Sequence, residues 1–267
     1  ENVFKDSAHR IRHRVCVTRV VGNPMENRGC IANYDPYDDQ FTLRATIQAA
    51  HGIRATIAGQ ILKIPQNKLR VICDNMGGGF GTRGGCEPEY SLSLWASEVV
   101  GRPVKWVADR SEGFLTDEQG RGGLADAELA LDADYNFLAI RTHTKVPIGA
   151  YYTSDRNFGS ATGAFSGMTG PYRMPVLHAT VTGAFTNMIG NAQYRGGAKP
   201  EPVHILEVMV DNAARQLNID PAELRRINTI HTDELPYKNC MGDIYDCGEF
   251  IENMDTCLEA GEYSTFP

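Results

Sequence analysis

Apolar residues occur along the chain in two patterns: short runs rich in β-branched residues, and longer stretches with apolar positions three or four residues apart. The short runs predict strands at 15–21, 30–34, 41–46, 69–73, 104–108, 124–132, 137–146 and 176–185. The longer stretches predict helices at about 53–62, 87–100, 201–217 and 249–261, and a further one after the capping sequence Asp220-Pro-Ala-Glu223. We therefore expect an α/β (mixed α+β) fold with mixed β-sheets and packed helices.

The spacing also predicts how helices pack. In the helix at 87–100, Tyr90, Leu94, Trp95 and Val99 lie on roughly one face. A glycine inside the preceding helix, Gly59, indicates close packing at that point, because a residue without a Cβ lets another element approach. The apolar fraction of 42% is sufficient for a sizeable core.

A glycine-rich loop joins the strand at 69–73 to the helix at 87–100. Its residues, Gly77-Gly-Gly-Phe-Gly81, place one large side chain, Phe80, among four glycines. Glycines let a ligand approach the backbone and let amides converge on an anion, and a helix N-terminus nearby favours negative charge. The loop lacks the Gly-Lys-Ser/Thr of a P-loop and the spacing of the dinucleotide fingerprint. It predicts either a tight turn with packing glycines or a site for another extended anionic or polar ligand.

A second glycine-bearing loop, Tyr194-Arg-Gly-Gly197, also lies between a predicted strand and a predicted helix. Arg195 could hold an oxyanion in a bidentate fork, or it could be a structural arginine bonded to carbonyls. Gln48, at the end of a strand, could donate a hydrogen bond to a ligand, or it could be a turn or capping residue. Glu26 and Arg28 are most simply a local ion pair.

Composition argues against several classes of function. The net charge of −7 and the lack of a Lys- or Arg-rich run argue against a nucleic-acid partner, and no apolar run of about 18 residues predicts a membrane span. None of the seven cysteines forms a Cys-x-x-Cys pair, so neither a disulfide framework nor a zinc site is predicted. Cys16, Cys30 and Cys73 are expected to be buried small hydrophobes, whereas Cys86 could lie near a site. Without an initiator Met, the chain is expected to be processed, truncated or incomplete.

Several short motifs follow one another along the chain in a specific order and spacing. They are Met25-Glu-Asn-Arg-Gly29, Thr46-Ile-Gln48 with His51 and Arg54, Gly77-Gly-Gly-Phe-Gly81, Gly101-Arg-Pro-Val-Lys-Trp106, Asp109-Arg-Ser-Glu112, Gly149-Ala-Tyr151, Gly170-Pro-Tyr172, Thr186-Asn187, Tyr194-Arg-Gly-Gly197 and Asp220-Pro-Ala-Glu-Leu-Arg225. In this order they resemble the first molybdopterin-binding domain of the molybdenum hydroxylase family, which includes xanthine dehydrogenase, aldehyde oxidoreductase and the large subunit of carbon monoxide dehydrogenase. The resemblance extends from about residue 15 to residue 267.

The resemblance implies roles for individual residues. Gln48 would hydrogen-bond a ligand of molybdenum, and Arg195 would lie close to the metal and the substrate, so both would take part in catalysis. The glycine loop would contact the pterin through its backbone, and no side chain would bind the metal directly. The implied cofactor-binding residues are Gln48, Gly78, Gly79, Phe80, Gly81 and Arg195.

The resemblance also implies cofactors and partners. Molybdenum would be bound to molybdopterin, in its cytosine dinucleotide form, and the protein would orient and tune a cofactor that supplies the redox chemistry. Electrons would pass to a 2Fe-2S small subunit and an FAD-binding medium subunit, in a cytoplasmic dimer of heterotrimers. Residues 1–240 would form the first molybdopterin-binding domain, and 241–267 would lead to a second one. That second domain would supply the general-base glutamate, so this fragment alone is expected to be inactive, and Glu26, Glu87, Glu89 and Glu201 are not candidates for the base.

Two positions depart from particular family members. Gly196 stands where the carbon monoxide-oxidising enzyme has a copper-binding cysteine, and Gly84 stands where purine hydroxylases have a glutamate. The sequence therefore favours the hydroxylation of an aldehyde or N-heterocycle with water as the oxygen source. Two alternatives stay open: a non-catalytic cofactor-binding or assembly module with the same fold, and a generic nucleotide-binding protein, against which the missing nucleotide motifs count.

Overall fold

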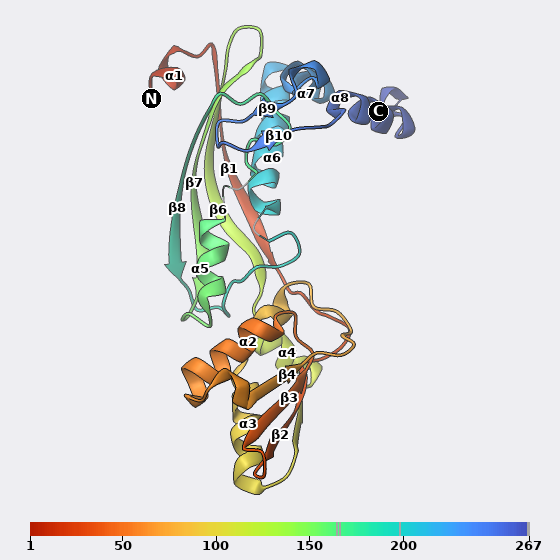
Figure 1. Ribbon diagram of the computed structural model, residues 1–267. Coiled ribbons are helices and arrows are strands. Elements are labelled where there is room, and N and C mark those ends of the chain that lie inside the picture. The colour runs from red at the N-terminus through yellow and green to blue at the C-terminus, as the bar shows by residue number, and fades with distance from the viewer. Residues whose placement is uncertain (164, 166, 198, 266–267) are drawn as a thin grey trace.

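The computed structural model describes residues 1–163, 165, 167–197 and 199–265, and it contains two lobes, each built on a four-stranded sheet (Figure 1). The chain begins in the upper lobe, enters the lower lobe after its first long strand, and returns to the upper lobe through a second long strand. Each lobe has its own cluster of buried apolar side chains. The loops that cross between the lobes therefore lie between two independent cores.

The sheet of the upper lobe contains four long strands, β1 (His9–Val20), β6 (Gly120–Leu131), β7 (Phe137–Gly149) and β8 (Val176–Phe185), in the order β1-β6-β7-β8. The β1–β6 and β6–β7 pairs are antiparallel, and β8 runs parallel to β7. Along β1, Ile11 and Val15 are buried in the core, whereas Arg12 and Arg14 are exposed, because successive strand side chains point to opposite faces.

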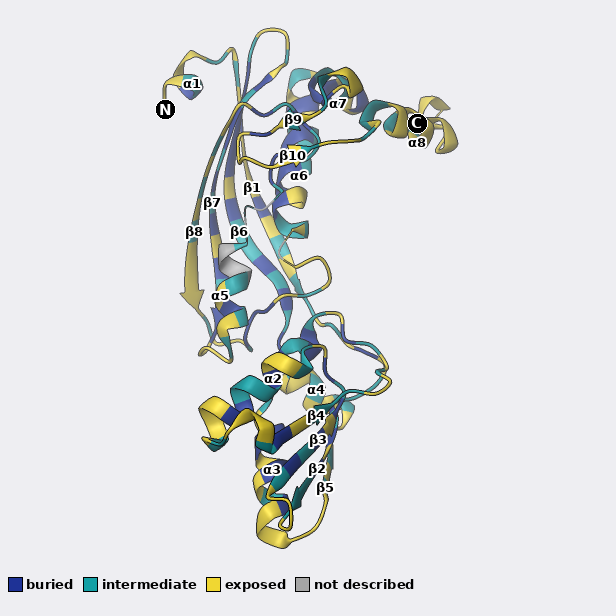
Figure 2. Cartoon of the chain, viewed as in Figure 1, coloured by how far each residue is buried: buried dark blue, intermediate teal, exposed yellow. Residues whose placement is uncertain are grey.

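Helices cover one face of this sheet. The core between sheet and helices is formed with α6 (Pro200–Leu217) and α7 (Pro221–Asn228), which contribute Ile205, Leu206, Met209 and Leu224. The short helix α5 (Asp155–Thr162) lies near β7 and β8. The remaining elements of this lobe are α1 (Asn2–Asp6), β9 (Tyr237–Lys238), β10 (Ile244–Tyr245) and α8 (Phe250–Ala260). Figure 2 shows that α8 is largely exposed.

The sheet of the lower lobe contains four shorter strands, β2 (Gly29–Asp35), β3 (Gln40–Ala45), β4 (Leu69–Ile72) and β5 (Val104–Val107), in the order β4-β3-β2-β5. β2 is antiparallel to β3 and β5, and β3 is parallel to β4. Its helices are α2 (Ala50–Thr56), which continues as a π-helical turn over Ile57–Leu62, α3 (Pro88–Val100) and α4 (Arg110–Thr116). The glycine loop follows β4 and precedes α3, as the sequence predicts.

The mixed α/β fold with mixed sheets and packed helices is confirmed. All eight predicted strands are present, with β1 starting earlier than expected, at His9, and the predicted hairpin is the β6–β7 pair. The helix after Asp220 is also confirmed, since the Asp220 carboxylate accepts hydrogen bonds from the N–H groups of Ala222 and Glu223 at 2.8 and 3.0 Å. These features depend on local sequence, which explains why they could be predicted.

Two packing predictions are wrong. Tyr90 and Leu94 of α3 are buried, but Trp95 and Val99 are 57% and 64% exposed. The buried face of α3 includes small residues such as Ser93, which lets the helix lie close to the sheet and turns the larger side chains outward. Gly59 is also exposed, and a Cβ built there has no neighbour within 4 Å among the described residues, so it does not mark close packing.

Two further expectations are corrected by the structure. Glu26 and Arg28 do not pair with each other: the Glu26 carboxylate accepts from the N–H of Gly77 at 2.5 Å, whereas Arg28 binds carboxylates near α3 and α4. Cys16 is exposed rather than buried, because it lies on the open face of the upper sheet, while Cys30 is buried and Cys73 is half-buried.

Candidate active site

Two loops that are far apart in the sequence meet where the lobes join. The N–H of Arg195 donates to the carbonyl of Phe80 at 2.9 Å. A Cβ built on Gly81 would lie 2.5 Å from the carbonyl oxygen of Gln193, so the two backbones are in direct contact. The glycine loop of the lower lobe and the Tyr194–Gly197 loop of the upper lobe therefore form one surface.

The glycine loop has an irregular backbone with free donors. Gly78, Phe80 and Gly81 have positive φ angles of 103°, 50° and 96°, a conformation that costs a non-glycine residue such as Phe80 free energy. The N–H groups of Gly78, Gly79 and Phe80 donate to no residue that the structure describes. Successive unpaired amides in such a backbone form an anion-binding concavity. Phe80 itself is 43% exposed.

The Gln48 side chain lies against this loop with a defined orientation. Its Oε1 accepts from the N–H groups of Gly81 and Arg83 at 2.8 and 3.3 Å. Because both neighbours are donors, the carboxamide oxygen must face them, which leaves Nε2 as a donor with no partner among the described residues. A Cβ on Gly79 would lie 2.6 Å from Cδ of Gln48, so a glycine is needed beside this amide.

Gly81 differs from its neighbours, because its backbone is already used within the protein. Its N–H donates to Gln48, and its carbonyl accepts from the N–H of Gly84 at 3.2 Å and from the Arg156 side chain. The cofactor contact expected for Gly81 stays a prediction, and the amides that are available as donors are those of Gly78, Gly79 and Phe80.

The Tyr194–Gly197 loop is held by an arginine that sequence reasoning missed. Arg121 at the start of β6 donates to the carbonyls of Tyr194 and Arg195 at 2.9 and 2.5 Å, and its guanidinium lies 5.3 Å from the centre of the Tyr194 ring. The arginine that is bonded to carbonyls of this loop is therefore Arg121, and not Arg195 as the sequence had left open. The Arg195 side chain is exposed and makes no hydrogen bond or ion pair with a described residue, so it is available to a ligand.

Comparison with known proteins identifies the domain. A family described as the molybdopterin cofactor-binding domain matches residues 1–229. The chain belongs to the molybdenum hydroxylase family, as its first molybdopterin-binding domain. It is 35% identical to the carbon monoxide dehydrogenase large chain of Hydrogenophaga pseudoflava, over 98% of this chain and 33% of that one.

Two further relatives are consistent with this assignment. The nicotine 6-hydroxylase large subunit of Paenarthrobacter nicotinovorans is 30% identical over 100% of this chain and 32% of its own length. The structure of quinoline 2-oxidoreductase from Pseudomonas putida 86 superposes with a TM-score of 0.90 and 29% identity, over 99% of this chain and 34% of that one. The molybdopterin-binding domain therefore spans about a third of the length of the relatives that it matches.

The residues at the joined loops fit a molybdopterin cofactor. The unpaired N–H groups of Gly78, Gly79 and Phe80 match the hydrogen-bonding needs of an anionic, acceptor-rich group. Gln48 Nε2 supplies a neutral donor beside them, and Arg195 supplies an exposed positive charge. No three His, Cys, Asp or Glu side chains within the described ranges cluster as a metal site. A pterin-held metal is compatible with this arrangement, because it needs no side-chain ligand.

A buried ion-pair cluster borders the glycine loop. Arg28 is 2% exposed and lies 3.0 Å from Glu87, 3.3 Å from Glu89 and 2.5 Å from Asp117. Burial alone would lower the pKa of Arg28, but these carboxylates raise it above its usual value. Arg83, also 2% exposed, donates to the carbonyl of Glu26 at 2.8 Å. These contacts give Glu87 and Glu89 structural partners.

The same cluster borders a cavity of about 330 Å³, lined also by Cys86 and Tyr152. Burial raises the pKa of the Cys86 thiol to about 11, so at neutral pH it is protonated and behaves as a small apolar side chain. Cys86 thus lines this cavity without the properties of a reactive thiolate, and its closeness to the cofactor stays a prediction.

Glu87 is expected to make stability depend on pH. Burial raises its pKa to about 7 from the ordinary 4.5, although Arg28 lies 3.0 Å away. The folded domain then binds this proton more tightly than the unfolded chain, so the contribution of Glu87 to stability falls as pH rises from about 4.5 to 7, by about 3 kcal/mol in total. Equilibrium urea unfolding of wild type and Glu87→Gln, from about pH 4 to about pH 9, measures the difference in stability, which should decrease as pH rises through 7 and then become constant. If the stability of the two proteins changed with pH in parallel, the raised pKa of Glu87 would be contradicted.

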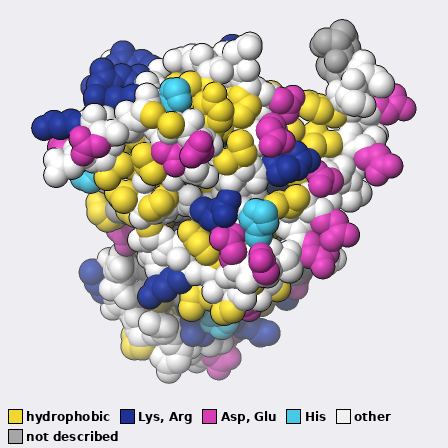
Figure 3. Space-filling model, turned by 90° about the horizontal axis from the view of Figure 1, so that it is seen from above, with side chains coloured by type: hydrophobic (Ala, Val, Ile, Leu, Met, Phe, Trp, Pro, Cys, Tyr) yellow, Lys and Arg dark blue, Asp and Glu magenta, His cyan; other side chains and the backbone are white. Residues whose placement is uncertain are grey.

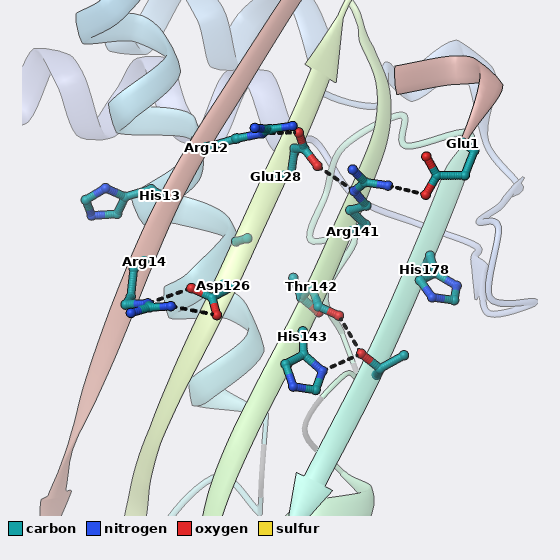
Figure 4. Close-up of a pocket in the computed structure, with 12 residues that line it drawn as sticks. Glu1, Arg12, His13, Arg14, Asp126, Glu128, Arg141, Thr142, His143 and His178 are labelled. Carbon is teal, nitrogen blue, oxygen red and sulfur yellow. Dashed lines mark hydrogen bonds and ion pairs between the residues drawn. The ribbon is translucent and has the colours of Figure 1, made fainter. Parts of the chain in front are cut away.

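A wider groove of about 770 Å³ lies on the open face of the upper sheet (Figure 4), and its lining includes no residue of the two joined loops. Its charges are paired across neighbouring strands: Arg14 binds Asp126 at 2.6 Å, and Glu128 binds Arg12 at 2.6 Å and Arg141 at 2.5 Å. Burial alone would raise the pKa of Glu128, but hydrogen bonds from Arg10, Arg12 and Arg141 hold it at about 2. Such pairing is typical of a solvated sheet face.

The molecule seen from above shows the same mixture of charges. Lys and Arg side chains are interspersed with Asp, Glu and apolar side chains (Figure 3). No helix among the described residues is long and apolar enough to cross a membrane.

Proposed function

We propose that this domain is part of the catalytic subunit of a molybdenum-dependent hydroxylase that oxidises an aldehyde or an N-heterocycle with water. The observation that carries the proposal is the convergence, at one surface, of a fixed donor from Gln48, the unpaired amides of Gly78 to Phe80 and the exposed guanidinium of Arg195. When bound there, the molybdenum cofactor supplies the redox chemistry. This chain's own residues bind it, orient it and provide positive charge beside it.

Each of these groups has a separate task in the proposal. The amides of Gly78, Gly79 and Phe80 hold the pterin through its polar atoms, because nothing else in the described chain uses them. Gln48 donates from Nε2 toward the metal centre, and Arg195 interacts with substrate or cofactor from the adjoining loop. Donors that are already oriented before the reaction stabilise developing negative charge most effectively.

Residue 196 favours a hydroxylase over a molybdenum–copper enzyme. Gly196 has a φ of 107°, a conformation that side chains rarely adopt, and a Cβ built there would lie 2.6 Å from Cγ of Pro200. A copper-binding cysteine at this position would require the loop to move. The first relative named above acts on carbon monoxide, but this backbone supports the hydroxylase-type assignment.

The wider assembly follows from the same proposal. Residues 1–240 form the first molybdopterin-binding domain, and 241–267 lead to a second one that carries the general base. The pterin has the cytosine dinucleotide form, and electrons leave through a 2Fe-2S small subunit and an FAD-binding medium subunit. The complex is a cytoplasmic dimer of heterotrimers.

Elemental analysis of the native complex tests the proposal most directly. We expect about one molybdenum per copy of this subunit, together with oxidation of aldehydes or N-heterocycles by an artificial electron acceptor. A fully assembled complex that contains no molybdenum would refute the enzyme assignment and leave the non-catalytic cofactor-binding module.

The substitution Gln48→Glu tests the donor role of Gln48. A glutamate can still accept from the N–H groups of Gly81 and Arg83, so the loop keeps its shape, but the Nε2 donor is lost. We expect kcat to fall by about 10²–10³-fold, as on the removal of one preorganised donor, while molybdenum content is retained. The matched control is Gln40→Glu. In the wild type, Nε2 of Gln40 donates to the carbonyl of Asn67 at 3.2 Å, and neither residue belongs to either loop. A kcat within twofold of wild type in Gln48→Glu would contradict the role.

A further inference from the structure

One half-buried side chain joins the two loops of the candidate site. Arg156, on α5, donates through Nη2 to the carbonyl of Gly81 and, at 3.3 Å, to the carbonyl of Gln193. Gly81 belongs to the glycine loop and Gln193 directly precedes Tyr194. A single guanidinium nitrogen therefore bridges a carbonyl from each lobe.

The other side of the guanidinium is anchored by a buried carboxylate. Arg156 Nη1 lies 2.6 Å from Oε2 of Glu118, which is 5% exposed. Oε1 of Glu118 accepts from Asn157 Nδ2 at 3.1 Å, from Ser154 Oγ at 3.2 Å and from the Thr153 hydroxyl. Asn157 also donates to the carbonyl of Asn191 at 2.8 Å. This network fixes α5, and with it the direction of the Arg156 side chain.

We propose that Arg156, anchored by Glu118, is the positioning residue that sets the distance between the glycine loop and the Tyr194–Gly197 loop. The inference rests on the proposed function for its effect on catalysis. Within the described residues, neither side chain is hydrogen-bonded to the Gln48 side chain, to the Arg195 side chain or to the amides of Gly78, Gly79 and Phe80. Arg156 acts through the Gly81 carbonyl, whose residue also donates its N–H to Gln48.

Electrostatics explains why an arginine is needed here. The Gly81 and Gln193 carbonyls converge on the same guanidinium nitrogen, so their partial negative charges repel each other unless a cation lies between them. Arginine offers several donors in a rigid plane, and it can satisfy a carboxylate on one edge and two carbonyls on the other. Lysine has a single charged nitrogen and cannot span all of these acceptors. Glutamine keeps a donor but loses the charge.

The contact that depends on this arrangement is the hydrogen bond from the Arg195 N–H to the Phe80 carbonyl. If the loops separate, this bond breaks, and Arg195 and Gln48 no longer face the same point. Misplacement of reacting groups by about 1 Å can lower a rate by about 10²-fold. The predicted effect of losing Arg156 is therefore local disorder at the loop contact together with a loss of activity.

The experiment compares Arg156→Gln, Arg156→Lys and Glu118→Gln with wild type in the assembled complex. Hydrogen exchange of the Arg195 amide, measured by mass spectrometry, is expected to be at least about tenfold faster in Arg156→Gln, because the bond to Phe80 is exposed more often. We expect kcat/KM to fall by about 10²-fold in Arg156→Gln and by less in Arg156→Lys, which keeps the charge. Glu118→Gln should lie between wild type and Arg156→Gln.

The matched control is Arg173→Lys. Arg173 also joins a carboxylate to a carbonyl, since it lies 3.4 Å from Glu234 and donates to the carbonyl of Ile227, but it belongs to the far end of the upper lobe. Arg173→Lys should leave both the exchange of the Arg195 amide and kcat/KM unchanged. Wild-type exchange at Arg195 in Arg156→Gln would overturn the inference.

The two readouts separate this inference from the proposed function. Hydrogen exchange depends only on the contact between the loops, so it reports on Arg156 even if the complex holds no molybdenum. Faster exchange without molybdenum in wild type would refute the hydroxylase and keep the positioning role. Unchanged exchange in a molybdenum-containing, active complex would refute only the role of Arg156.

Discussion

Replacing Gly81 with alanine is expected to lower kcat/KM of the assembled enzyme by about 10²-fold and to reduce its molybdenum content. Gly81 has a φ of 96°, and a Cβ there would lie 2.5 Å from the carbonyl oxygen of Gln193. Since that neighbour is backbone, the contact cannot be relieved by rotating a side chain. The two loops must separate, which breaks the hydrogen bond between Arg195 and Phe80.

The chain offers a matched control for the conformational part of this effect. Gly101 also has a positive φ, 62°, but a Cβ built there meets nothing within 4 Å among the described residues. Gly101→Ala should therefore cost about 1–2 kcal/mol of stability from the left-handed conformation and leave kcat/KM unchanged. Steady-state kinetics and molybdenum analysis of both variants distinguish the effect of backbone strain at a positive φ from the effect of forcing the two loops apart. Equal activity in the two variants would show that the loop contact is not needed.

Replacing Arg28 with methionine is expected to have the largest effect on stability, lowering the free energy of unfolding by about 3–5 kcal/mol. The substitution leaves the buried carboxylates of Glu87 and Asp117 without their cation, and Arg28 itself is 2% exposed. The guanidinium also lies 5.5 Å from the centre of the Trp106 ring. Equilibrium urea unfolding, followed by tryptophan fluorescence, measures the loss.

An exposed ion pair supplies the comparison. Arg14 and Asp126 pair at 2.6 Å on the open sheet face, with side chains 64% and 46% exposed. Because solvent screens such a pair, Arg14→Met should change the free energy of unfolding by less than about 1 kcal/mol. If Arg28→Met were no more destabilising than Arg14→Met, the buried cluster would contribute nothing net to the stability of the lower lobe.

The sequence by itself determined the elements and the position of the two loops. Strands follow from short β-branched runs, and the start of α7 follows from Asp220, because these signals act between neighbouring residues. The order of the motifs was enough to name the family, which the comparisons show. Gln48, Phe80 and Arg195 were selected from those motifs, and their roles toward the cofactor remain proposals.

Only the tertiary structure decided which distant residues meet. Trp95 was expected on the apolar face of α3 but is exposed, since the face that packs is chosen by the sheet beneath it. Arg121 and Arg156 carry no local signal, yet they hold the loop carbonyls because β6 and α5 bring them there. Local patterns specify what each segment forms. The partners of a long polar side chain depend instead on contacts between segments that lie far apart in the sequence, 73 and 75 residues apart for the contacts of Arg121 and Arg156 with Tyr194 and Gly81.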